Sequence, residues 1–117
     1  MPTILENIDV WKRAVALAKD IRKICRDNQY LKNDFWMRDQ IQRAAISIAS
    51  NIAEWNDRHS DKEFIRYLVI ARWSASELKT QLYIIEDDIE KTIFEKLLNE
   101  VVGIHKMLNG FIKTLQK

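Results

Sequence analysis

The sequence contains few of the residues that interrupt helices or cross-link chains. Its 117 residues include two glycines, one proline and one cysteine, Cys25. Scarce glycine and proline, beside abundant Ala, Leu, Ile, Lys, Glu and Arg, favour long helices over strands. A lone cysteine excludes a disulfide within the chain. No strand alternation, internal repeat or low-complexity tract is present, so we expect a single domain over residues 1–117.

Long apolar runs are missing as well. No stretch approaches the ~18 consecutive apolar residues needed to span a membrane. The segment from Met1 to Glu6 lacks both the basic start and the apolar run of a secretion signal. We therefore expect a cytoplasmic protein with no membrane partner.

The residue patterns of metal and catalytic sites are absent too. His59 and His105 lack the glutamate three residues earlier that di-iron bundles use, because those positions hold Asn56 and Val102. There is no His-Glu-x-x-His motif, cysteine pair, glycine-rich phosphate loop or nucleophile elbow. We expect His59 in an exposed turn and His105 at the boundary of the core or within it. The sequence thus predicts no enzyme, no cofactor and no metal.

Apolar residues recur at helical spacing along four segments. This periodicity predicts helices at about residues 8–27, 34–55, 61–86 and 93–115. Asn7 is a candidate N-cap of the first helix. Ser60 and Thr92, each followed three residues later by glutamate, have the form of capping boxes for the third and fourth. Gly103 and Gly110 fall within the fourth helix, which we expect to continue through both. Four amphipathic helices with short connections predict an all-α, antiparallel up-down-up-down four-helix bundle.

Charge is small overall, a net of +2, but it is unevenly placed. Residues 12–26 hold six basic residues and one acid, whereas residues 86–100 hold six acids and two lysines. Such asymmetry can steer a polyanion to one side of a molecule, although charge runs are more often solvated helix faces. The candidate phosphate-binding residues are Lys12, Arg13, Lys19, Arg22, Lys23 and Arg26.

A line of polar residues follows the second predicted helix, at steps of three and four that place them on one face. The line comprises Gln40, Arg43, Ser47, Asn51, Glu54 and Arg58. The third predicted helix offers Ser74 and Glu77 at a similar spacing. Three interpretations are open: a solvated face, a buried hydrogen-bonded network, or a contact between subunits. Small residues beside the charges favour close contact, and we expect one of the arginines to pair with a carboxylate such as Glu54 or Glu77.

These residues carry a resemblance to a known family. The segments Asp-Gln-Ile-Gln-Arg-Ala-Ala-Ile-Ser-Ile at 39–48 and Asn-Ile-Ala-Glu at 51–54, with Ser74 and Glu77 further on, resemble four-helix-bundle proteins encoded in intervening sequences of 23S rRNA genes. The resemblance implies a left-handed bundle, assembly into a ring that is expected to be a homopentamer, and no enzymatic role. The same family includes the accessory variability protein of diversity-generating retroelements. That relative implies RNA or DNA, and a protein such as a reverse transcriptase, as partners.

Two tryptophans depart from the family pattern. Glycine is usual after Asn-Ile-Ala-Glu and before the serine of the third helix, where this sequence has Trp55 and Trp73. Glycine permits a helix C-cap and close backbone approach, whereas tryptophan adds a large contact surface. Either the two indoles mark a remodelled interface or pocket, or they fill local grooves of the bundle.

Two functions remain open at this point. The first is a non-enzymatic, oligomeric protein that binds RNA or DNA through the basic first helix, with an affinity that falls steeply with salt. The second is a protein-binding adaptor or structural ring without a nucleic-acid role. Its partner would dock on exposed members of the set Trp11, Trp36, Trp55 and Trp73.

Overall fold

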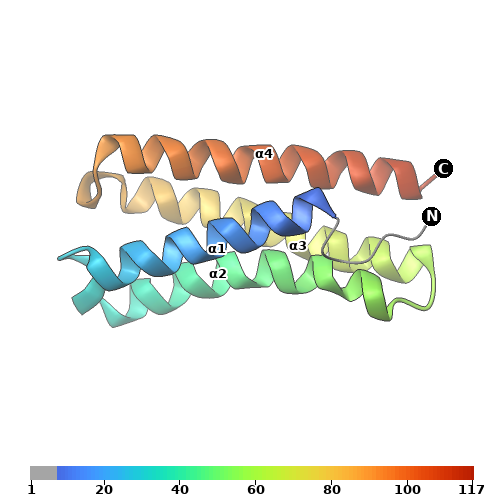
Figure 1. Cartoon of the computed structure of the whole chain (residues 1–117), viewed down its shortest axis with the longest axis horizontal. Helices are drawn as coiled ribbons and strands as arrows, with labels where there is room; N and C mark the ends of the chain where they lie inside the picture. Colours follow the sequence, from blue (N-terminus) through green and yellow to red (C-terminus); the bar gives the residue numbers. More distant parts are fainter. Residues whose placement is uncertain (1–7) are drawn as a thin grey trace.

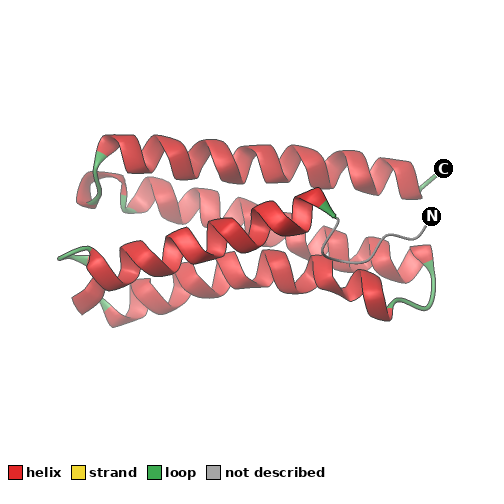
Figure 2. Ribbon diagram, in the orientation of Figure 1, coloured by secondary structure: helices red, strands yellow, loops and turns green. Residues whose placement is uncertain are grey.

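Four long helices make up most of the chain in the computed structural model, which describes residues 8–117. They are α1 (Asp9–Asp27), α2 (Phe35–Ala53), α3 (Asp61–Ile84) and α4 (Lys91–Leu115). Short 3-10 turns occupy the connections: η2 (Leu31–Asn33), η3 (Glu54–Asp57) and η4 (Glu86–Asp88). The described residues contain no strand (Figure 2). The predicted all-α four-helix bundle is confirmed. Among residues 8–117 we find no helix with the length and apolar composition of a membrane span.

The helices follow one another back and forth along the long axis of the bundle, as the colour gradient in Figure 1 shows. Each helix packs against the one before it, and α1 also packs against α4. The α1–α2 and α3–α4 connections consequently lie at one end of the bundle, and the α2–α3 connection lies at the other (Figure 1). The handedness of the bundle stays a prediction.

One continuous apolar core runs between the four helices. It is built from the periodic apolar positions, which place one stripe of each helix inward. Fully enclosed side chains from all four helices include Ile21, Ile41, Ile48, Ile52, Phe64, Leu68, Leu78, Leu82, Ile104 and Leu108. The outward faces carry mostly charged and polar residues, together with a few exposed large apolar side chains such as Phe35, Trp36 and Trp73.

The helix ends agree only in part with the predicted caps. The Ser60 hydroxyl accepts a hydrogen bond from the Glu63 amide at 3.1 Å, and the Glu63 carboxylate accepts one from the His59 amide at 3.2 Å. A capping box at Thr92 is wrong: α4 already begins at Lys91, after Glu90 in extended conformation and without a side-chain cap. Asn7 lies outside the described residues.

The two glycines of α4 lie within continuous helix, as predicted. A Cβ atom at Gly103 would approach Nη2 of Arg13 to 2.7 Å, so the missing side chain leaves room for that guanidinium. Arg13 extends from α1 to the Glu100 carboxylate on α4, at 3.1 Å. Gly110 is different, because a Cβ atom there would have no neighbour within 4 Å.

Replacement of Gly110 by alanine is expected to raise the free energy of unfolding by about 1 kcal/mol, the usual gain in helix propensity. The site is exposed and free of clashes, so no packing loss opposes this gain. Urea denaturation followed by circular dichroism would measure the change. A free energy of unfolding for Gly110→Ala equal to or below that of the unsubstituted protein would contradict this prediction.

Candidate nucleic-acid interface

The outward face of α1 is basic. Lys12, Lys19 and Lys23 are all exposed, and steps of seven and four place them along one side of the helix. Arg26 continues this side towards the C-terminal end of α1 and is also exposed. Four of the six basic residues predicted for phosphate contact therefore share one open face.

Arg13 lies apart from that face. It is half-buried between α1 and α4, where its Nη2 atom is 3.1 Å from Glu100 and its Nη1 atom is 3.2 Å from the sulfur of Met107. Its charge is thus already paired within the chain. In the structure Arg13 joins two helices, and its side chain stays 39% exposed.

Arg22 and Arg26 border a hollow between α1 and α2, which we term the α1–α2 basin. Its volume is about 320 Å³, and its lining residues are Arg22, Cys25, Arg26, Lys32, Arg38 and Gln42. None of them is acidic. Arg38 donates a hydrogen bond from Nη1 to the Lys32 carbonyl oxygen at 2.9 Å, which holds its side chain across the start of α2.

Cys25 lies at the buried side of this basin. Its thiol is 4.0 Å from the Arg38 carbonyl oxygen. Burial raises the pKa of the Cys25 thiol to about 11; the nearby Arg38 charge opposes the shift and Asp39 adds to it. The thiol is accordingly protonated at pH 7.

The polar line along α2 is partly buried against α3. The hydroxyls of Ser47 and Ser74 lie 2.8 Å apart, and the Asn51 amide donates to the Ser47 carbonyl oxygen at 2.8 Å. The Gln81 side-chain nitrogen donates to the Gln40 carbonyl oxygen at 3.4 Å. The buried oxygen of the same Gln81 amide has no hydrogen-bond partner among the described residues.

The charged members of the line do not pair as expected within the chain. Arg58 lies 3.7 Å from Asp61 and donates to the Trp55 carbonyl oxygen at 2.8 Å, so its predicted pairing with Glu54 or Glu77 is replaced by a contact across the α2–α3 connection. Arg43 and Glu77 are exposed, and neither forms an ion pair with any residue from 8 to 117. The polar line thus has a hydrogen-bonded network at its centre, whereas the charges of Arg43 and Glu77 are exposed to solvent.

The four tryptophans separate into two pairs. Trp11 and Trp55 are partly buried against the core, and the Arg58 guanidinium lies over the Trp55 ring at 4.5 Å. Trp36 and Trp73 are exposed by 71% and 65%. Of the two positions that depart from the family pattern, one fills a local groove and the other presents an indole to solvent.

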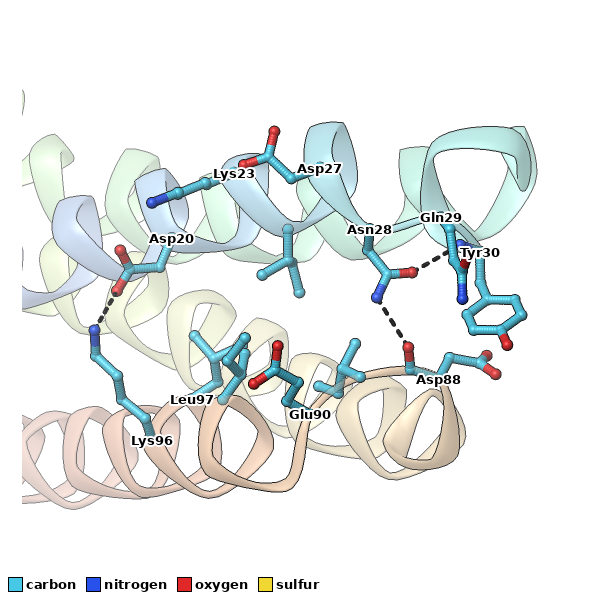
Figure 3. Close-up of a pocket in the computed structure, with 13 residues that line it drawn as sticks. Asp20, Lys23, Asp27, Asn28, Gln29, Tyr30, Asp88, Glu90, Lys96 and Leu97 are labelled. Atoms are coloured by element: carbon cyan, nitrogen blue, oxygen red, sulfur yellow. Dashed lines mark hydrogen bonds and ion pairs between the residues drawn. The ribbon is translucent and has the colours of Figure 1, made fainter.

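A second hollow lies between the last turn of α1 and the start of α4, at the end of the bundle that holds the α1–α2 connection (Figure 3). It has a volume of about 630 Å³. Its acidic lining residues are Asp20, Asp27, Asp88 and Glu90, against the cations Lys23 and Lys96. The Asn28 amide donates to the Asp88 carbonyl oxygen at 2.9 Å, which ties the α1–α2 connection to η4. This acidic lining makes the hollow unsuited to a phosphate.

The histidines take the positions expected of them. His59 is exposed beside the N-cap of α3, and His105 is half-buried on α4 with Nδ1 at 3.3 Å from the Asn109 amide nitrogen. Burial, and then the Arg72 and Lys79 charges, lower the pKa of His105. Residues 8–117 contain no group of three or more His, Cys, Asp or Glu side chains placed to hold a metal ion.

Comparison with known proteins gives a family but no activity. No curated protein matches the chain. A solved structure of a protein with unknown function from the S23 ribosomal protein family of Bacteroides thetaiotaomicron superimposes with a TM-score of 0.79 at 28% identity, covering 90% of this chain and 96% of that one. The family model for 23S rRNA-intervening sequence proteins matches residues 6–110. The chain therefore belongs to the 23S rRNA-intervening sequence protein family.

Proposed function

We propose that the protein is a non-enzymatic, self-associating four-helix bundle that binds RNA or DNA through α1. The observation that carries the proposal is the open basic face of α1, where Lys12, Lys19 and Lys23 are exposed and Arg22 and Arg26 extend the charge to the α1–α2 basin. A polyanion is the partner whose charge suits such a face. Arg13 is left out of the proposed contact because Glu100 already pairs with it.

Binding of this kind rests on phosphate contacts, which position a nucleic acid without reading its bases. Each contact releases counterions, so the affinity falls with salt in proportion to the number of phosphates neutralised. No base-reading motif is present in the sequence. We therefore expect weak dependence on nucleotide sequence and strong dependence on ionic strength.

The nucleic-acid proposal is tested by titrating RNA and DNA with the purified protein over a series of salt concentrations. The double variant Lys12→Gln, Lys19→Gln is expected to bind more weakly, with a salt slope reduced by about 0.7 to 0.9 for each lost contact. The matched control is Lys106→Gln, Lys113→Gln, which removes the same charge from exposed positions of α4. Failure of the intact protein to bind either nucleic acid at low salt would reject the proposal.

Self-association is proposed to use the α2–α3 face. This face presents the exposed Trp73 and the charges of Arg43 and Glu77, which have no ion-pair partner among residues 8–117. A second copy would supply partners for all of them, and a closed ring, such as the pentamer that the resemblance implies, would repeat the basic face of α1 around its axis. Light scattering coupled to size exclusion gives the mass, and a single-chain mass at high concentration would reject the assembly.

A protein-binding adaptor is the second candidate function. It is favoured by Trp36 and Trp73, since exposed tryptophans are frequent anchors of protein interfaces. A purified partner that remains bound after nuclease treatment, and that is lost from a Trp36→Ala variant of unchanged mass, would favour this function over nucleic-acid binding.

A further inference from the structure

The α1–α2 basin gathers positive charge that is mostly unpaired among residues 8–117. Four of its six lining residues are cationic and none is acidic. Within residues 8–117, Arg22, Lys32 and Arg38 form no ion pair, and Arg26 has a single one, at 3.6 Å to the exposed Asp27. Like charges held together in this way repel one another, and a bound anion relieves the repulsion. The basin is therefore suited to an anionic ligand.

The arginines of the basin favour a phosphate as the anionic ligand. An arginine presents planar, fixed donors that match the oxygens of a phosphate, and here three arginines converge with one lysine. Arg38 is partly preorganised, because one of its nitrogens is held by the Lys32 carbonyl oxygen at 2.9 Å. A phosphate group in the basin would meet donors from both helices.

An exposed aromatic ring lies directly beside these donors. The Arg38 guanidinium lies over the Phe35 ring, 4.7 Å from its centroid, and Phe35 is 64% exposed. Phe35 is the first residue of α2, so it stands at the edge of the bundle and not over its core. A simple anion gains nothing from such a ring, whereas a nucleobase attached to the phosphate can stack on it.

We propose that this end of the protein binds single-stranded RNA or DNA, with a backbone phosphate in the α1–α2 basin and a neighbouring unpaired base on Phe35. The proposal rests on the nucleic-acid function proposed above and specifies the class of nucleic acid. In a duplex the bases are stacked within the helix and are not free to lie on a protein side chain. The phosphate contacts can form with either a single strand or a duplex, but only a single strand has an unpaired base that can stack on the Phe35 ring.

The test compares a short oligothymidylate with a DNA duplex of equal length at low salt. The original chain is expected to prefer the single strand. Phe35→Leu keeps an apolar side chain of similar size but removes the ring, and we expect about a tenfold loss of single-strand affinity with little change for the duplex. Phe35→Trp keeps an aromatic ring at this position and is expected to keep the preference for the single strand over the duplex. The masses of all variants are checked by light scattering, so that a change of assembly is not mistaken for a change of contact.

A second pair of variants tests the basin. Arg22→Gln with Lys32→Gln is expected to weaken single-strand binding more than Lys12→Gln with Lys19→Gln, which removes equal charge from the outward face. Equal affinity for single strand and duplex, unchanged by Phe35→Leu but reduced by loss of Lys12 and Lys19, would overturn this inference and leave the general function standing. An equal loss for both nucleic acids in Phe35→Leu would also overturn it, because the ring would then only position Arg38. No binding of either nucleic acid would overturn both proposals.

Discussion

Replacement of Phe64 by alanine is expected to lower the free energy of unfolding by about 3–5 kcal/mol, the usual cost of emptying a core aromatic site. Phe64 is fully buried in α3, and its ring packs edge to face with that of Phe111 from α4, with the ring centroids 5.5 Å apart and an angle of 83° between the planes. The Arg58 guanidinium lies 5.9 Å from the same ring. The substitution therefore removes packing, an aromatic pair and a cation–π contact together.

Urea denaturation at fixed protein concentration measures this loss, since self-association would make the midpoint depend on concentration. Phe35→Ala is the matched control: it deletes the same side chain from an exposed position and is expected to change stability by less than about 0.5 kcal/mol. A loss below about 1 kcal/mol at Phe64 would show that the core is less tightly packed there than the structure describes.

Replacement of Trp73 by alanine is expected to weaken self-association by about 30-fold or more at each contact, without loss of the folded bundle. Truncated tryptophans at the centre of protein interfaces commonly cost 2 kcal/mol or more. Trp73 is 65% exposed in the single chain and contributes little to its core, so its bulk is available to a second copy. The neighbouring Glu77→Ala is expected to act in the same direction, because Glu77 is exposed and lacks an ion-pair partner within the described chain.

Light scattering over a dilution series separates this effect from unfolding. The Trp73→Ala variant should show a smaller mass at equal concentration while its helical circular dichroism is retained. Phe35→Ala again provides the control, since it removes an equally exposed ring from a position that we assign to nucleic acid rather than to assembly. If Trp73→Ala and Glu77→Ala both kept the original mass, the α2–α3 face would not be the contact between copies.

The elements of the fold could be predicted because their signals are local. Apolar spacing gave all four helices, and the Ser60 capping box fixed the start of α3 to the residue. The predicted helix ends agree less closely with the structure. The capping pattern at Thr92 predicts a start of α4 at Ile93, two residues later than the observed start at Lys91. Thr92 already lies inside the helix, because the Phe94 amide donates to the Glu90 carbonyl oxygen and closes the first turn. A cap motif indicates a helix start only where the preceding backbone is not helical.

Only part of the candidate site could be predicted from the sequence. The basic face of α1 follows from spacing along one helix, but the α1–α2 basin joins Arg22 and Arg26 to Lys32 and Arg38 across a turn. Their meeting depends on how α2 folds back, which no single-helix periodicity records. One signal was available: in a helical hairpin with a short connection, residues at similar distances before and after the turn lie together. Applied to Arg26, this rule points towards Lys32 and the first turns of α2.

The acidic hollow has a consequence for the direction in which a bound strand runs. The Asn28 amide ties the α1–α2 connection to η4, where Asp88 and Glu90 border the hollow in Figure 3. A phosphate chain leaving the α1–α2 basin over that end of the bundle would approach these carboxylates and be repelled. Along α1 it would instead meet Lys19 and Lys12. We therefore expect the two charge signs to set a path as well as a binding point: the acidic hollow repels a polyanion, and the length of α1 is open to it.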